Sequence, residues 1–273
     1  MSRNMISMSD LIGILDDISP EMNSEEWDNG GFLVGRSDKS IGKIMIALEP
    51  ALSVIDEAIA FGADLLLVHH PVIFAPLSSV TSESLRGEKV LRLAENSIAL
   101  YAAHTSFDTA IGGNNDYLIE LLGLPKSQDI AGGIGRTAEL AEPRSVKDFA
   151  KFIAERLDIP ASEMRISSPD ITGKLHKIAV CTGAGGDIID EAISEGCDCL
   201  ITGDMRYHAA LDAVERDFTV IDAGHFGTEK IFSDNMMKKL MSALTHKGYN
   251  VSSDEGICIK LAESEHSPFA PIL

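Results

Sequence analysis

Ala63-Asp-Leu-Leu-Leu-Val-His-His-Pro-Val-Ile-Phe74 is the stretch that decides the fold of this 273-residue chain. Its Leu65–Val68 segment is a short, uninterrupted apolar run, which is typical of a buried strand covered on both faces. The run leads directly to His69 and His70 and stops at Pro71. Because consecutive strand side chains point to opposite faces, neighbouring histidines reach one site only where the backbone turns or where two metal ions lie side by side. The alternative is one packed histidine and one solvated histidine.

The composition is that of a globular protein, with 45% hydrophobic residues and only 5% aromatic residues. The 23 basic and 42 acidic residues give a net charge of −19, which disfavours nucleic-acid binding through a basic face. The sequence shows no signal-peptide core and no apolar run long enough to cross a membrane, so we expect a cytoplasmic protein with no membrane partner. The four cysteines form no CxxC motif, and we expect them to be reduced and structural, with Cys197 and Cys199 on one face of a strand.

Alternating strand and helix patterns predict an α/β protein with mainly parallel sheets and helices outside. Strands are expected at residues 32–34, 43–48, 65–68, 98–103, 177–181, 198–202, 219–222 and 256–261. Helices are expected at residues 11–18, 52–61, 82–96, 114–122, 145–157, 187–194, 206–216 and 228–246. The polar, glycine-rich residues 126–140 suit a domain boundary. We therefore expect lobe I to contain residues 1–125 plus 226–273, and lobe II to contain residues 126–225.

An internal repeat supports two similar lobes. Five single identities or short runs recur at a constant offset of 134 without a gap. They are Lys43-Ile44, Asp56-Glu-Ala-Ile59, Gly62, Asp64 and Leu66 against Lys177-Ile178, Asp190-Glu-Ala-Ile193, Gly196, Asp198 and Leu200. The pattern predicts two βαβ units of one design. The copies then diverge, because Gly203-Asp204 stands where the first copy has the two histidines.

Two further predicted strands end in a histidine followed four residues later by an acidic residue. His104 precedes Asp108 and His225 precedes Glu229, so four histidines and two carboxylates follow three strands. Imidazole and carboxylate ligands suit Zn, Mn, Fe, Co or Ni, and six such side chains exceed the needs of one tetrahedral ion. Two ions about 3.5–4 Å apart with a bridging carboxylate would use them all. A strand-end polar residue remains the alternative for His104.

Other motifs are weaker. The glycine-rich Gly183-Ala-Gly-Gly186 follows a strand as phosphate-binding turns do, but it lacks both full nucleotide-binding patterns, so a simple turn is favoured. In the 203–208 segment Arg206 or His208 could bind a substrate anion, and a surface cluster is the alternative.

The chain resembles the GTP cyclohydrolase type 2 homologues, also called the Nif-three-like family. The matching motifs, in the family's order, are Glu26-Trp-Asp-Asn29, Leu67-Val-His-His-Pro71, Ala103-His-Thr-Ser-Phe-Asp108, Ile201-Thr-Gly-Asp204 with Tyr207-His208, and Gly224-His225 with Thr228-Glu229. The resemblance implies a dinuclear metal centre in the cleft between two α/β lobes. It implies five metal ligands, which are His69, His70, Asp108, His225 and Glu229, and bridging roles for the two carboxylates. His104 is then either a further ligand or a catalytic group that moves protons.

These observations predict a metal-dependent hydrolase with two divalent metal ions per chain. The resemblance implies that it acts on GTP, a related nucleotide or a small phosphorylated molecule through a metal-activated water. It also implies a toroidal homohexamer, a trimer of dimers. The alternative function is a non-catalytic metal-binding scaffold or regulatory interaction protein that forms the same ring.

Overall fold

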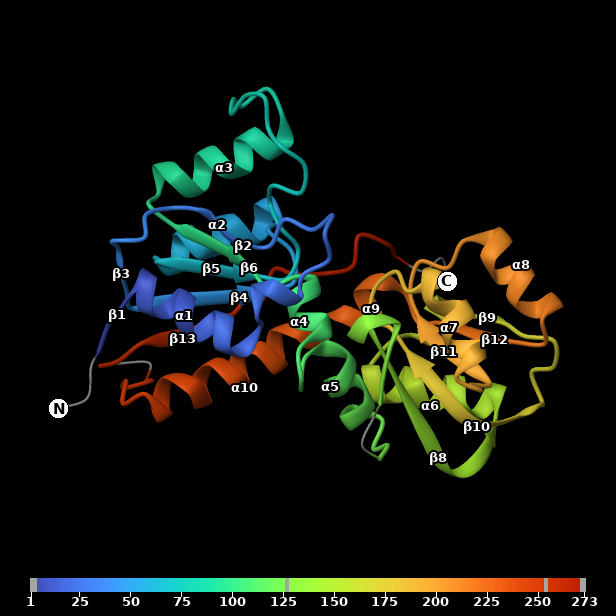
Figure 1. Cartoon of the computed structure of the whole chain (residues 1–273). Helices are drawn as coiled ribbons and strands as arrows, with labels where there is room; N and C mark the ends of the chain where they lie inside the picture. Colours follow the sequence, from blue (N-terminus) through green and yellow to red (C-terminus); the bar gives the residue numbers. More distant parts are fainter. Residues whose placement is uncertain (1–3, 126–127, 253–254, 271–273) are drawn as a thin grey trace. The chain divides into compact units, whose positions relative to one another are not determined.

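The computed structural model of the chain describes residues 4–125, 128–252 and 255–270, and it contains two compact units (Figure 1). The first unit contains the residues up to Ala110 together with Phe232–His266. The second contains Ile111–Ile231 and the residues from Ser267 onward. This division differs from the expected lobes at residues 111–125, 226–231 and 267–270, which belong to the second unit.

The first unit is built on a five-stranded sheet in the order β13-β4-β5-β6-β2. Its strands are β2 (Gly31–Val34), β4 (Lys43–Ala47), β5 (Leu65–Val68), β6 (Ala99–Ala102) and β13 (Cys258–Leu261). Neighbouring strands are parallel except for β2, which pairs antiparallel with β6. All four residues of β5 are buried, as the apolar run predicts. The short strands β1 (Ile6–Ser7) and β3 (Ser40–Ile41) form a separate antiparallel pair.

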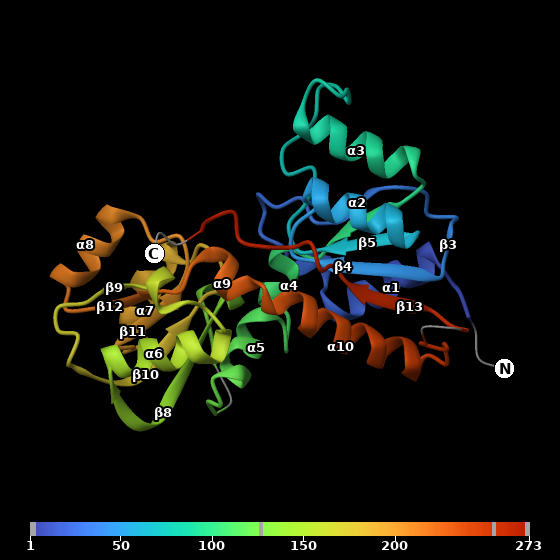
Figure 2. The same ribbon diagram turned by 180° about the vertical axis from the view of Figure 1, so that it is seen from behind.

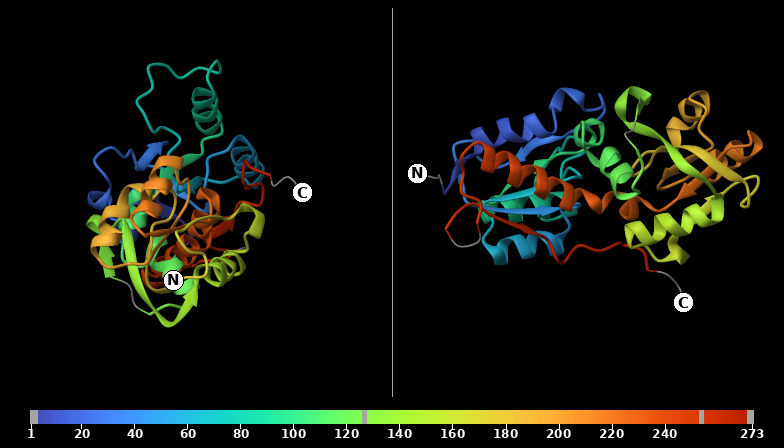
Figure 3. Two further views of the ribbon diagram at one scale, coloured as in Figure 1. Left: turned by 90° about the vertical axis from the view of Figure 1, so that its right-hand side faces the viewer. Right: turned by 90° about the horizontal axis from the view of Figure 1, so that it is seen from below.

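Helices cover both faces of this sheet (Figures 1 and 2). On one face lie α2 (Leu52–Phe61) and α3 (Leu85–Glu95), and buried residues of α2 share an apolar cluster with alternate residues of β4, β5 and β6. On the other face α1 (Met8–Ile18) and α10 (Ile231–His246) run side by side (Figure 3, right). The sheet is therefore buried on both sides, which is the condition under which parallel strands are continuously apolar.

The second unit is built on a six-stranded mixed sheet in the order β7-β8-β10-β11-β12-β9. Its strands are β7 (Gln128–Ile130), β8 (Gly135–Ser145), β9 (Arg165–Ser167), β10 (Lys174–Val180), β11 (Cys199–Thr202) and β12 (Thr219–Asp222). Only β10-β11 and β11-β12 are parallel pairs, because the edges are closed by antiparallel strands. The expectation of mainly parallel sheets is thus wrong for this unit.

The polar segment 126–140 is not a simple linker. Its described part forms β7, a turn and the start of β8, and the turn uses Gly132 and Gly133, both with positive φ. Glycine adopts that left-handed backbone without a steric penalty, so the composition reflects a hairpin turn and not a domain boundary.

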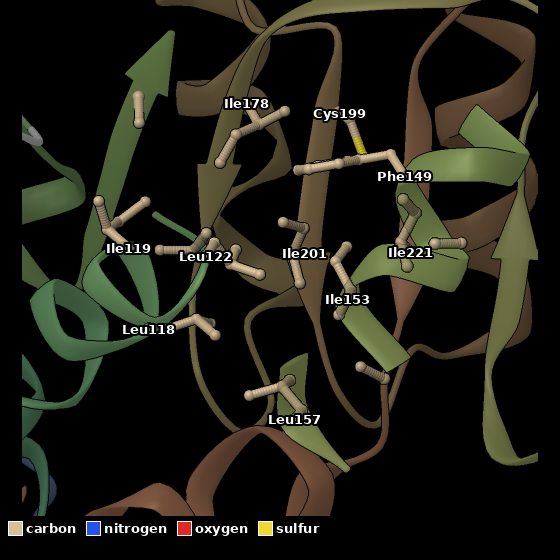
Figure 4. Close-up of a cluster of buried hydrophobic side chains, with 14 of the residues drawn as sticks. Leu118, Ile119, Leu122, Phe149, Ile153, Leu157, Ile178, Cys199, Ile201 and Ile221 are labelled. Carbon is tan, nitrogen blue, oxygen red and sulfur yellow. The ribbon is translucent and has the colours of Figure 1, made fainter. Parts of the chain in front are cut away.

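One face of the second sheet carries α5 (Asn114–Leu121) and α6 (Val146–Leu157), whose apolar residues pack on β8, β10, β11 and β12 (Figure 4). This packing places residues 111–125 in the second unit. The other face carries α7 (Ile189–Ser194) and α8 (Tyr207–Glu215).

The internal repeat is confirmed in the hydrogen bonds of both copies. The Asp64 side chain accepts from the backbone N–H of Gly42 and Lys43 at 2.9 and 3.0 Å. Asp198 does the same for the N–H groups of His176 and Lys177, at 2.6 and 3.0 Å.

The strand registers agree as well, since Ile44 pairs with Leu65 and Ile178 pairs with Cys199, both at the offset of 134. In each copy a glycine with positive φ follows the helix: Gly62 is the C-cap of α2, and Gly196 comes directly after Glu195, the C-cap of α7. The repeated residues therefore mark one shared βαβ design.

Two local expectations are wrong. The long helix expected over residues 228–246 is two helices, α9 (His225–Glu229) and α10, and the first begins three residues earlier. Cys197 and Cys199 belong to clusters on opposite faces of the second sheet, because β11 begins only at Cys199 and Cys197 lies in the preceding turn. All four cysteines are free thiols, as expected. Among the described residues, no helix combines the length and apolarity needed to span a bilayer.

Candidate metal centre

His69 and His70 follow β5 at the point where its backbone leaves the sheet. The N–H groups of both residues donate to one acceptor, the carbonyl of Leu48 just beyond β4, at 3.2 and 3.0 Å. Two successive N–H groups can share one carbonyl only where the backbone turns. This turn ends the alternation of strand side chains and brings the two rings to within 4.9 Å of each other, measured between centroids.

The Nδ1 atom of each ring is engaged by an oxygen acceptor. The Nδ1 of His69 lies 2.8 Å from the carbonyl oxygen of Ala103, and that of His70 lies 2.7 Å from Oε1 of Glu49. Carbonyl and carboxylate oxygens only accept, so Nδ1 carries the proton and, in the neutral ring, the Nε2 lone pair becomes the donor to a metal ion.

His104 is held in the same way by a third acceptor. It follows β6 and precedes the short helix α4 (Thr105–Thr109), and its Nδ1 lies 2.6 Å from Oδ1 of Asp28. The side chain of Asp28 is fully buried and also accepts from the N–H and Oγ1 of Thr105, at 3.1 and 2.5 Å. Burial raises the pKa of this carboxyl, but the hydrogen bonds from His104 and Thr105 outweigh it and lower the pKa to about 2. Asp28 is therefore ionised at neutral pH and keeps the Nδ1 proton of His104 in place.

The three rings converge on one point in the first unit. The centroid of His104 lies 5.2 Å from that of His69 and 5.3 Å from that of His70. One ligand nitrogen from each ring lies within 4.8 Å of the others, so the three imidazoles can hold a metal ion. The structure thus places His104 beside the predicted ligands His69 and His70. The alternative that His104 is merely a polar residue at the end of a strand did not predict this grouping.

Asp108 lies in α4, one turn after His104, and its side chain is buried. Its Oδ2 is 3.5 Å from Nε2 of His69. Two ligand atoms at about 2.1 Å from one tetrahedral ion are about 3.4 Å apart, so this separation suits a shared ion. The first unit therefore contains three of the five predicted metal ligands.

The other two predicted ligands belong to the second unit and both lie on α9. His225 is the first residue of this helix and Glu229 is one turn further, so they share a helix face. The Nε2 of His225 is 2.9 Å from Oε2 of Glu229, and its Nδ1 is 2.9 Å from Oδ2 of Asp204. With Nδ1–H donated to Asp204, the neutral ring presents Nε2, next to Glu229, as a metal donor.

The backbone of two glycines, Gly183 and Gly203, packs closely against Glu229 and His225. A Cβ on Gly183 would lie 2.1 Å from Oε1 of Glu229, and a Cβ on Gly203 would lie 2.5 Å from the backbone nitrogen of His225. Gly183 and Gly203 also hydrogen bond to each other, N–H to carbonyl, at 2.7 Å. The divergence of the repeat thus has a local cause, since the position equivalent to His69 cannot carry a side chain here. In the glycine-rich segment 183–186, the first glycine packs against Glu229, and this close approach excludes a side chain at Gly183.

Three acceptor residues were not identified from the sequence as parts of the site. Asp28 and Asp204 lie inside motifs that carry the family resemblance, and this was the signal that could have found them. Glu49 follows a strand without any recognisable motif, so only the fold reveals its contact with His70. Arg206 and His208 are exposed beside Tyr207, so their expected role in anion binding stays a prediction.

The protein is an α/β protein of two repeat-related units. Each unit carries imidazole and carboxylate donors beyond the carboxyl ends of its parallel strands, and these donor sets suit first-row divalent metal ions. Residues 6–255 match the family model described as Duf34/NIF3 (NGG1p interacting factor 3), and the chain belongs to this family.

Relatives of similar sequence and solved structures of similar fold agree with this assignment. The chain is 38% identical over 253 residues to a GTP cyclohydrolase 1 type 2 homolog of Clostridium acetobutylicum, covering 90% of this chain and 93% of the relative. It is similar in fold to a NIF3-related protein of Bacillus cereus, with a TM-score of 0.89, 22% identity, and coverage of 99% of this chain and 100% of the other. The hypothetical protein SA1388 of Staphylococcus aureus has a TM-score of 0.88 and 26% identity, with 97% and 99% coverage.

Proposed function

We propose that this protein is a metal-dependent hydrolase that uses two divalent metal ions per chain and acts on GTP, a related nucleotide or a small phosphorylated molecule. The observation that carries the proposal is the common state of the four histidines. In each, Nδ1 faces a fixed oxygen acceptor, from Ala103, Glu49, Asp28 or Asp204. Such carboxylate–histidine and carbonyl–histidine pairs fix the tautomer and ring orientation of metal-binding histidines.

The donors fit first-row divalent ions, namely Zn, Fe, Mn, Co or Ni, because they are imidazoles and carboxylates without thiolates. The proposed ligands are His69, His70, Asp108, His225 and Glu229. When bound, such ions supply a water molecule of lowered pKa and polarise the bond under attack.

The chain's own residues then position and move protons. Asp28 holds the imidazole of His104 with Nδ1 protonated, so Nε2 is the atom that can accept a proton from water and return it to a leaving group. We propose this catalytic role for His104. Nucleotides enter the proposal through the name of the relatives, which are GTP cyclohydrolase 1 type 2 homologs.

Metal content is the first test. Elemental analysis of protein purified without added metal or chelator is expected to find about two first-row ions per chain, and the His69→Ala/His225→Ala double variant is expected to lose both. Protein that holds no metal, and takes up none when it is offered, would refute the proposal.

Turnover separates the hydrolase from a non-catalytic scaffold. In a hydrolase, Asp108→Asn is expected to abolish GTP hydrolysis while the protein stays folded and keeps its oligomeric state. In a scaffold or regulatory interaction protein, wild type shows no turnover, and Asp108→Asn instead lowers the melting temperature or disrupts assembly, since metal bound only to the folded state stabilises it.

The proposed assembly is a homohexamer, a trimer of dimers. Light scattering of wild type and of Asp108→Asn measures this state directly. The cytoplasmic location stays a prediction from the sequence.

A further inference from the structure

Two exposed aromatic rings lie beside His104 in the first unit. The side chains of Trp27 and Phe74 are 59% and 43% exposed, and their ring centroids are 6.0 Å apart. Each ring also meets His104 edge-on, Trp27 at 6.1 Å and Phe74 at 6.3 Å, with interplanar angles of 78° and 82°. The two rings and the imidazole therefore form one contiguous aromatic group with two of its members open to solvent.

The segments that carry these rings are tied together by hydrogen bonds. The side-chain N–H of Asn29 donates to the carbonyl of Ile73, which links the segment of Trp27 to that of Phe74. Between Trp27 and Asn29, Asp28 is buried and bonded to His104. The backbone directly after Trp27 is thus anchored by the contacts of Asp28 and Asn29, and the indole itself contacts Phe74 and His104.

Leaving large aromatic surfaces in water has a cost, since burying such a side chain is worth about 1.5–3 kcal/mol. A ring that is fixed in place and exposed beside reactive histidines is suited to bind another ring, because aromatic groups stack at centroid distances of about 4.5–7 Å. Base stacking on one aromatic side chain is worth about 1–3 kcal/mol.

We propose that Trp27 and Phe74 bind the planar base of a single nucleoside or nucleotide whose reacting group lies at His69, His70 and His104. This inference rests on the proposed function and narrows its substrate to molecules that carry a heteroaromatic ring. Two rings accommodate one base, and the net charge of −19 opposes attraction of a long polyanion. The occupant is therefore a mononucleoside or mononucleotide and not a nucleic-acid strand.

The sequence supplies its own reporter for this proposal, because Trp27 is the single tryptophan of the chain. Guanosine, adenosine, uridine, GTP and tripolyphosphate are titrated separately into the metal-loaded protein while indole emission is followed, with free tryptophan as the correction for absorbed light. A nucleoside that stacks on the indole is expected to quench its emission with saturation, GTP is expected to quench likewise, and tripolyphosphate is expected to leave the emission unchanged.

Phe74→Leu tests the second ring, and Phe269→Leu is its matched control because Phe269 is 79% exposed and belongs to the second unit. Removing one stacking contact is expected to weaken nucleoside binding about 5-fold or more, whereas the control is expected to bind like wild type. The proposal is overturned if no nucleoside quenches, if tripolyphosphate quenches as strongly, or if both leucine variants bind alike. It is also overturned if the indole emission changes with protein concentration alone, which would indicate that a second copy of the chain covers the rings.

The two proposals fail in different ways. Saturable quenching by nucleosides without any GTP hydrolysis supports base binding and contradicts the hydrolase. Hydrolysis of GTP with the same KM in wild type, Phe74→Leu and Trp27→Leu supports the hydrolase and contradicts base binding.

Discussion

Replacing Gly183 by alanine introduces a methyl group where the carboxylate of Glu229 now lies. The new Cβ would be 2.1 Å from Oε1 and 3.0 Å from Cδ of Glu229, and 3.4 Å from Cε1 of His225. Glu229 is only 4% exposed, so its side chain has little free space into which it can move. The substitution therefore displaces a proposed metal ligand without removing any ligand atom.

The cost has two parts that can be separated. Gly183 has a φ of +67°, and an alanine in this left-handed region costs about 1–2 kcal/mol. Gly196 provides the matched control, because its φ is +73° and its Cβ would meet nothing within 4 Å. Gly196→Ala therefore carries the backbone cost alone, which corresponds to a fall in melting temperature of about 2–8 °C. Gly183→Ala carries the same cost and also shifts Glu229.

Metal affinity is the discriminating readout. Titration with zinc or manganese after chelation, followed by elemental analysis, is expected to show affinity about 10- to 100-fold weaker in Gly183→Ala than in wild type. Gly196→Ala is expected to bind like wild type. Equal metal affinity in the two alanine variants would refute the argument that Glu229 is a metal ligand held in place by the close approach of this glycine.

Three further predictions concern the histidine partner, the metal and the thiols. The pKa of Asp28 is lowered to about 2, so its contribution of about 2 kcal/mol to stability is complete above its ordinary pKa near 3.8 and is lost as the pH falls through 2. The gap in melting temperature between wild type and Asp28→Asn should therefore be wide at about pH 7 and narrow at about pH 2 and below. A gap independent of pH would contradict this. Chelation is expected to lower the melting temperature, since a free metal concentration of 100 times Kd stabilises the fold by about 2.7 kcal/mol. An unchanged melting curve after chelation would argue against metal binding. Burial raises the pKa of the Cys197 thiol to about 11 and also raises that of Cys199, whereas Cys258 is half-buried. A thiol reagent should therefore label Cys258 first in the folded protein. Mass spectrometry of the labelled peptides measures the order of labelling, and a different order would contradict this prediction.

The βαβ repeat could be read from the sequence because its determinants are local. Asp64 bonds to Lys43 in β4 and Asp198 bonds to Lys177 in β10, each in the preceding strand of its own unit. The turns at Gly62 and Gly196 need a residue that tolerates positive φ. Such interactions lie within about twenty residues and recur at one offset. The antiparallel strands β7, β8 and β9 left no comparable signal, since the two edge strands β7 and β9 have only three residues each and β9 pairs with β12, which lies far along the chain.

The histidines and carboxylates of the candidate site were likewise visible in the sequence as residues that follow strands. Their chemical state was not. That His69 and His70 turn into one site depends on the carbonyl of Leu48, and the tautomer of His70 depends on Glu49. The exposed rings of Trp27 and Phe74, about fifty residues apart, meet where Asn29 bonds to the carbonyl of Ile73, a contact that only the fold reveals. Residue type and spacing along the chain therefore determined which donors are available, whereas hydrogen bonds between distant segments decided where the donor atoms point, because a side chain's orientation is set by the partners that the fold brings to it.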